Sequence, residues 1–185
     1  VFPILEHEHI QGAFYPPVKA VTEHTVLDVN KIHFILASTP EDNFPVLLNE
    51  IKQLILTNTD EFGLKSYDEY FKELAVANRF DPAEVIFVKR LLQVALPEVL
   101  RKRMADILFE KIVGIEESAF SRELYMSVDQ IKCMVDCGMH IGSHGYDHYW
   151  LANLETDKMK KDIDMALEAM DEFIDRKCWV LNYPY

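Results

Sequence analysis

The chain is poor in cysteine, in positive charge and in long apolar segments. Its 185 residues include three cysteines, an odd number that gives no disulfide framework and suits a reducing compartment. Lys and Arg number 19 against 31 Asp and Glu, and the resulting net charge of −12 argues against nucleic acid or an anionic membrane as a partner. No apolar run approaches the length of a membrane span, and the N-terminal residues do not read as a signal peptide. The sequence therefore predicts a soluble globular domain, which we expect in the cytoplasm, and it does not indicate the oligomeric state.

The clearest chemical signal is a loop that carries two histidines, His144 and His148. The helix expected before it has both ends marked, since Ser127 and Gln130 form a capping box and Gly138 stands at the C-cap. The order helix, glycine, strand, loop predicts that both histidines follow the carboxyl end of a strand, where barrel-like α/β folds carry their chemistry. Two imidazoles four residues apart either converge on one metal ion or form an ordinary surface pair.

A family resemblance begins in this loop. The sequence Gly-Ser-His-Gly-Tyr-Asp-His at 142–148, followed by Trp150, Leu151 and Leu154, resembles the second motif of the polysaccharide deacetylases, the NodB-homology carbohydrate esterases. Gly145 stands where the family most often has a hydroxyl residue that helps to hold the loop, while both histidines are in place.

Both ends of the chain extend the resemblance. Residues 1–15 resemble the helix and second strand that follow the family's first motif, and residues 179–185 resemble its third motif, with Asn182 in place of the usual arginine. The first motif itself, whose two aspartates act as catalytic base and third metal ligand, is expected upstream of Val1. The resemblance does not cover the middle of the chain.

The resemblance implies an α/β fold that is part of a deformed (β/α) barrel of the NodB type, interrupted by a large α-helical insertion. Residues 1–24 would form the first part of the deacetylase-like barrel, residues 25–124 the helical insertion, and residues 125–185 the second part with the histidine motif. The insertion either covers and stabilises the barrel or forms a lid that influences substrate choice.

The same resemblance implies roles for particular residues. His144 and His148 would hold a divalent metal ion, with zinc as the default, although cobalt, nickel or iron fit the same ligands. The backbone N–H of Tyr185 would stabilise the oxyanion and is the catalytic contribution expected from this chain. Tyr183 and Trp150 would bind the substrate.

Apolar residues at helical spacing predict that the middle of the chain is helical. Stripes of this kind occupy residues 44–55, 67–74, 85–95 and 100–112. Residues 26–37 fit either a strand or a helix.

Outside this middle the pattern alternates between helix and strand. We predict a helix at residues 1–9 and a strand at 12–15, and, after the histidine loop, a helix capped by Asn153 or Thr156 followed by a strand at 178–181. Strand, helix and strand in this order predict parallel neighbours joined by a right-handed crossover.

The function that the resemblance implies is metal-dependent removal of N-acetyl groups from a sugar or polysaccharide substrate, which releases acetate. Two alternatives stay open. One is an amidohydrolase of the same fold that acts on a non-carbohydrate amide, such as a cyclic ureide. The other is a non-catalytic member that binds a protein partner through its helical insertion.

Overall fold

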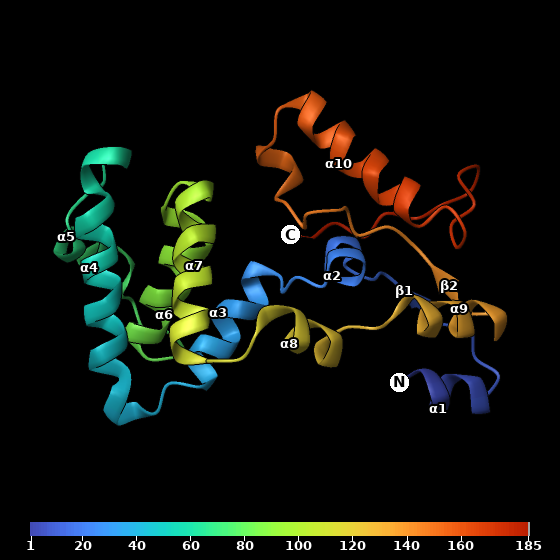
Figure 1. Ribbon diagram of the computed structural model, residues 1–185, viewed down its shortest axis with the longest axis horizontal. Coiled ribbons are helices and arrows are strands. Elements are labelled where there is room, and N and C mark those ends of the chain that lie inside the picture. The colour runs from blue at the N-terminus through green and yellow to red at the C-terminus, as the bar shows by residue number, and fades with distance from the viewer. Residues whose placement is uncertain (185) are drawn as a thin grey trace. The chain divides into compact units, whose positions relative to one another are not determined.

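The computed structural model describes residues 1–184, and these fold into two compact units (Figure 1). The first, which we call the discontinuous unit, consists of residues 1–27 and of the chain from residue 116 onward. The second, which we call the helical unit, consists of residues 28–115. The chain therefore leaves the discontinuous unit after residue 27 and returns to it at residue 116.

The discontinuous unit combines helices with one small sheet. In chain order, its elements are α1 (Phe2–His7), β1 (Ala13–Phe14), α2 (Val18–Glu23), α8 (Glu117–Leu124), α9 (Val128–Asp136), β2 (His140–Ile141), the 3-10 helix η3 (Leu151–Asn153) and α10 (Thr156–Ala169).

Parallel backbone pairing joins the two pieces of the discontinuous unit. β1 and β2 run parallel, with Ala13 opposite His140. A third segment extends the pairing, because Ser143 forms an isolated parallel bridge with Leu181. In this bridge the N–H of Ser143 donates to the carbonyl oxygen of Val180 at 2.9 Å. The expected parallel neighbours are therefore present.

The pairing is so close that residue 142 has no room for a side chain. A Cβ at Gly142 would lie 2.5 Å from Cε1 of Tyr15 and 2.8 Å from the carbonyl oxygen of Val180. That carbonyl already accepts the hydrogen bond from Ser143, so it cannot move away without breaking the bridge. Glycine at this position is thus a condition for bringing the three segments together.

Helix α9 has the ends that its sequence predicts. The side chain of Ser127 accepts from the N–H of Gln130 at 3.2 Å, and the side chain of Gln130 accepts from the N–H of Ser127 at 3.0 Å, which completes the capping box. At the other end Gly138 has a φ of +82°, and the N–H of Met139 donates to the carbonyl of Met134 at 2.9 Å. This Schellman-type ending turns the chain directly into β2.

The core of the discontinuous unit is built from α2, α9, β2, α10 and the turn after α10. These elements contribute apolar side chains that contact one another away from solvent, and burial of such surface is the main favourable contribution to folding. The buried members are Val18, Val21, Ile131, Ile141, Ala166, Leu167, Met170 and Ile174.

The helical unit contains α3 (Asp28–Ala37), the 3-10 helix η1 (Glu41–Asn43), α4 (Phe44–Phe62), α5 (Tyr67–Leu74), α6 (Ala83–Arg90), the π-helical turn η2 (Leu91–Ala95) and α7 (Glu98–Ile112). Helices α4 and α7 run antiparallel (Figure 1). Two ion pairs show this order, since Lys111 near the end of α7 pairs with Glu50 at 2.7 Å, while Arg103 near its start pairs with Glu61 at 3.2 Å. Within residues 1–184, no helix is both long and apolar enough to cross a membrane.

Most elements that the sequence predicts are present. Helices α4, α5 and α7, and α6 together with η2, cover the predicted apolar stripes. Helix α9 lies between its predicted ends, and β1 and β2 lie inside the predicted strand segments. The ambiguous segment 26–37 forms helix α3. Helices α2 and α8 are not predicted from the sequence. The first starts directly after Pro17, and the second is capped by the side chain of Glu116, which accepts from the backbone N–H groups of Ser118 and Ala119.

Two local predictions are wrong. The N-cap of α10 is Glu155 rather than Asn153 or Thr156, because Asn153 already ends η3. The predicted strand at 178–181 contributes only the bridge at Leu181. The first residue of this segment, Cys178, belongs to a turn instead, in which its N–H donates to the carbonyl of Asp175 at 3.0 Å.

The barrel that the resemblance implies is not shown by residues 1–184, whose sheet has two strands. The assignment of residues 1–24, 25–124 and 125–185 to barrel parts and insertion stays a prediction, as does a lid role for the helices. Helix α8 packs in the discontinuous unit, where the Ser121 hydroxyl lies 3.2 Å from the carbonyl oxygen of Ala20 and 3.0 Å from that of Thr25.

The space around Gly142 gives a first test. We expect Gly142→Ala to lower the free energy of unfolding by about 1–3 kcal/mol, because the added methyl group meets backbone on one side and an aromatic ring on the other. Amide hydrogen exchange at Ser143 should accelerate as the bridge to Val180 opens. Urea unfolding and exchange measured by NMR provide the two readouts.

Gly114→Ala is the matched control, since a Cβ there meets nothing within 4 Å and only the φ of +68° is strained. This variant should leave exchange at Ser143 unchanged. Unaltered exchange at Ser143 in Gly142→Ala would contradict the argument from close approach.

Candidate functional site

The histidine loop follows the carboxyl end of β2, as the sequence predicts. Its backbone is unusual, since Gly145 has a φ of +75° and His148 has a φ of +58°. The second value is uncommon for a residue with a side chain, and such conformations persist only where surrounding contacts hold them. The contacts that hold this loop come from α2, α10 and the segment around Asn182.

The two histidine rings lie next to each other. Their centroids are 4.8 Å apart with an interplanar angle of 71°. Nδ1 of His144 lies 2.8 Å from the backbone carbonyl oxygen of Asn182. Because a carbonyl oxygen can only accept, Nδ1 carries the proton, and in the neutral ring Nε2 keeps its lone pair. A ring held in this way is oriented as metal-bound histidines usually are.

The environment of His148 keeps its imidazole neutral. Burial, followed by the charge of the neighbouring His144, lowers the pKa of His148 to about 4. The lone pair of this ring is therefore not blocked by a proton at neutral pH.

A buried carboxylate from α10 reaches the backbone of the loop. Oδ2 of Asp162 accepts from the N–H of Tyr146 at 3.0 Å, and Oδ1 accepts from the N–H of Asp147 at 2.9 Å. Asp162 is 4% exposed. The hydroxyl of Ser143 adds a weaker contact, because it accepts from the N–H of Gly145 at 3.3 Å.

Helix α2 holds the other side of the loop. The side chain of Lys19 forms a hydrogen-bonded ion pair with Asp147, and the backbone N–H of Lys19 donates to the carbonyl of Tyr146 at 3.2 Å. Burial lowers the pKa of Lys19, but the hydrogen bond and charge of Asp147 outweigh that effect and leave the pKa raised. The hydroxyl of Tyr146 donates to the carboxylate of Glu23 at 2.5 Å. The loop is thus tied to two helices by charged groups.

The remaining predicted site residues lie close to the loop in the sequence or in the fold. Trp150 follows the loop and is 43% exposed, and Tyr183 follows Asn182, the residue that binds His144, and is 67% exposed. Tyr185 lies outside the described residues, so its predicted catalytic role stays a prediction. The substrate-binding roles of Trp150 and Tyr183 also stay predictions.

The donors in this loop fit a divalent metal ion in part. His144 and His148 supply two imidazole rings, the ligand type that zinc accepts. Residues 1–184 contain no group of three or more His, Cys, Asp or Glu side chains arranged to hold a metal. A tetrahedral site with open positions would need a further ligand beyond these two rings.

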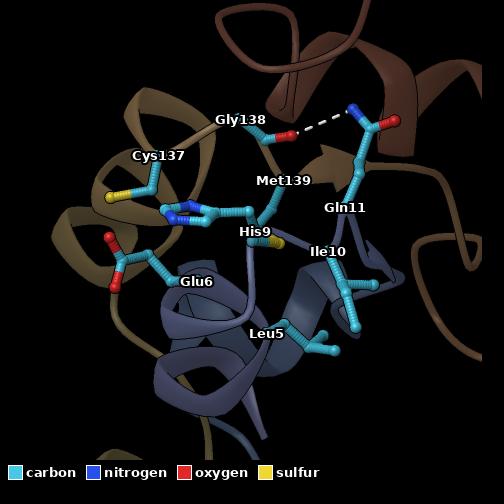
Figure 2. A pocket seen from close by; sticks show the side chains of 8 residues that line it. All are labelled: Leu5, Glu6, His9, Ile10, Gln11, Cys137, Gly138 and Met139. Carbon is cyan, nitrogen blue, oxygen red and sulfur yellow. Dashed lines mark hydrogen bonds between the residues drawn. The ribbon is translucent and has the colours of Figure 1, made fainter.

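A separate hollow lies at the other end of the strands. Figure 2 shows Glu6, His9 and Cys137 around it, with the side chain of Gln11 donating to the carbonyl of Gly138 at 2.9 Å. These residues precede β1 and β2, so the hollow lies at the amino ends of the strands, whereas the histidine loop follows their carboxyl ends. It is therefore distinct from the candidate site.

Sequence reasoning missed the two charged residues that hold the loop, Asp162 and Lys19. Asp162 falls on the apolar face of α10 together with Ala166 and Met170, at spacings of one helical turn. A carboxylate in an apolar stripe is the sequence signal that could have identified it, since unpaired charges are rarely buried. Lys19 offers no comparable signal, because its partner is far away in the sequence.

Comparison with known proteins gives one family. Residues 102–185 match the family model described as polysaccharide deacetylase. The matched segment starts within α7 and includes α9, β2, the histidine loop and α10. No significant match was found among curated proteins or among solved structures.

The family match supports deacetylase activity in general, which is the hydrolysis of amide bonds in carbohydrates, and it suggests a NodB-type fold. The resemblance carried by the histidine loop is confirmed, because residues 102–185, which include this loop, match the polysaccharide deacetylase family model.

Proposed function

We propose that the protein is a metal-dependent deacetylase that removes N-acetyl groups from a sugar or polysaccharide. The observation that carries the proposal is the pair of adjacent histidine rings in the loop after β2, of which His148 is held neutral by burial. One of them donates its Nδ1 proton to the carbonyl of Asn182, which leaves the Nε2 lone pair of His144 available. The family match over the same residues supports this chemistry.

His144 and His148 would hold the metal ion, and zinc is the expected element. When bound, such an ion lowers the pKa of a water molecule from ~15.7 toward ~7 and polarises the carbonyl group of the amide. The hydrogen bond to Asn182 fixes the tautomer of His144. Burial of His148 keeps protons from competing for its lone pair.

Substrate contacts are proposed for two exposed aromatic residues, one directly after the loop and one next to Asn182. Trp150 and Tyr183 have exposed aromatic rings, which combine a flat apolar face with a polar edge and suit the alternating polar and apolar surface of a sugar. The backbone N–H of Tyr185 is proposed to donate to the oxyanion that forms as the amide is attacked.

Removal of either ring tests the metal proposal. We expect His144→Ala and His148→Ala to lose the bound divalent ion and the deacetylation of an N-acetylated chitooligosaccharide, because each removes one of the two imidazole ligands. Elemental analysis of the purified full-length protein and measurement of released acetate are the readouts. Allantoin serves as the comparison substrate, since its turnover in place of the sugar would favour a non-carbohydrate amidohydrolase.

His7→Ala is the control for this experiment. His7 lies in the same unit with an exposed side chain, so its loss should change neither metal content nor acetate release. Full metal occupancy in both His144→Ala and His148→Ala would show that the loop is not the metal site.

The low pKa of His148 gives a pH-dependent prediction for the metal-free protein. Unfolding returns this pKa from about 4 to its ordinary value near 6.5, so the unfolded chain binds the proton first as the pH falls. Stability should therefore be complete above about pH 6.5, decline as the pH falls toward 4, and decline no further from this residue below that value. Urea unfolding at a series of pH values in the presence of a chelator measures it.

His148→Asn provides the comparison, because asparagine tolerates a φ of +58° better than most residues do and does not titrate. Its stability should depend less on pH than that of the wild type between pH 4 and 6.5. Equal pH dependence in both proteins would contradict the assignment of the low pKa to His148.

A further inference from the structure

The side chain of Asp162 forms hydrogen bonds that do not contribute to helix α10 itself. It occupies a buried stripe with Ala166 and Met170, where an apolar side chain would pack without loss. A carboxylate taken out of water at such a position is destabilising unless its oxygens find donors. Asp162 finds them outside its own helix, in the loop between the two histidines.

The two donors are successive backbone amides. Each oxygen of the Asp162 carboxylate takes one, with the N–H of Tyr146 at 3.0 Å and the N–H of Asp147 at 2.9 Å. Hydrogen bonds to an ionised acceptor are stronger than those between neutral groups. Because each peptide N–H is rigidly attached to its peptide plane, two such bonds fix the orientation of both planes between His144 and His148.

The carboxylate also occupies the space that a side chain at position 145 would need. A Cβ added to Gly145 would lie 2.7 Å from Oδ2 of Asp162, and the φ of +75° at Gly145 already disfavours any residue with a side chain. The residues at positions 145 and 162 are therefore coupled. Glycine in the loop leaves the room that Asp162 fills.

We propose that Asp162 is the positioning residue of the histidine loop. By binding the two amides it sets the backbone course from Gly145 through Asp147, and with it the placement of His148, whose φ of +58° needs outside support. The spacing of 4.8 Å between the histidine rings follows from that course. The inference rests on the proposed function in taking this loop as the metal-binding one, but the contacts it describes exist in the metal-free protein.

The test compares Asp162→Asn with Asp164→Asn in the full-length protein. Asparagine keeps the size of Asp162 but replaces one acceptor oxygen by a donor, which faces a backbone N–H. Asp164 lies on the same helix and is exposed, so its substitution removes the same charge without touching the loop. In metal-free protein, amide exchange at Tyr146 and Asp147 should accelerate about tenfold or more in Asp162→Asn, and it should stay at the wild-type rate in Asp164→Asn.

A second readout separates positioning from general stability. Zn²⁺ is titrated into each protein at a temperature where circular dichroism shows it fully folded, and the ring resonances of His144 and His148 are followed. We expect Asp162→Asn to bind Zn²⁺ about tenfold more weakly than the wild type, a change that loss of a supporting contact to a metal ligand typically produces. Wild-type Zn²⁺ affinity in folded Asp162→Asn would overturn the positioning role.

Gly145→Ala keeps the proposal testable if Asp162→Asn does not fold. Its methyl group displaces the Asp162 carboxylate without removing it, so the same two amides should lose protection. Wild-type exchange at Tyr146 and Asp147 in Gly145→Ala would overturn the proposal. Absence of Zn²⁺ binding by the wild-type protein would instead contradict the proposed function, and amide exchange would then decide the role of Asp162 by itself.

Discussion

The close parallel approach of three backbone segments, at residues 13–14, 140–143 and 180–182, is the constraint on which the discontinuous unit depends. Gly142 lies within it, and the ring of Tyr15 and the carbonyl of Val180 both lie within 3 Å of where its Cβ would be. The approach also sets the candidate site, because it brings the carbonyl of Asn182 within 2.8 Å of His144. Segments separated by the width of a side chain could not form that bond.

The electrostatics of the site run against those of the chain as a whole. A net charge of −12 would ordinarily favour protonated histidines, yet the pKa of His148 is lowered, because burial and the neighbouring His144 both disfavour the charged ring. The nearby carboxylates of Asp147 and Asp162 are bound by Lys19 and by backbone amides. Carboxylates whose oxygens are occupied in this way hold the loop in shape while the ring of His148 stays neutral.

The sequence predicted those parts of the structure that depend on neighbouring residues. The capping box at Ser127 and the glycine at position 138 are local signals, and they correctly placed α9, β2 and the start of the histidine loop. The family resemblance was likewise carried by contiguous residues. The segment at 178–181 was misjudged as a strand because nothing in its own composition shows that the preceding turn extends to Cys178.

The contacts that hold the loop could not be predicted, because they join distant parts of the chain. Lys19 and Asp147 are separated by 128 positions, and no local pattern distinguishes this lysine from those on an ordinary exposed helix. Asp162 is close to the loop in sequence, but Asp164 two positions later has the same chemistry and faces solvent. Only the packing of α10 decides which of the two carboxylates turns inward.

The division of the chain into the helical unit and the discontinuous unit has a consequence for the order of folding. The register of β1 with β2 pairs Ala13 with His140, so the sheet cannot form until the ends of a very long loop meet, which is entropically unfavourable and slow. Residues 28–115 form a unit of their own inside that loop, and α3 packs on α7 through the ion pair of Lys31 with Asp106. If residues 28–115 fold first, they replace a flexible loop by a compact body in which α3 and α7, the helices at its two ends, are in contact. The folded helical unit would then lower the entropic cost of bringing β1 and β2 together, and with it the cost of assembling the histidine site.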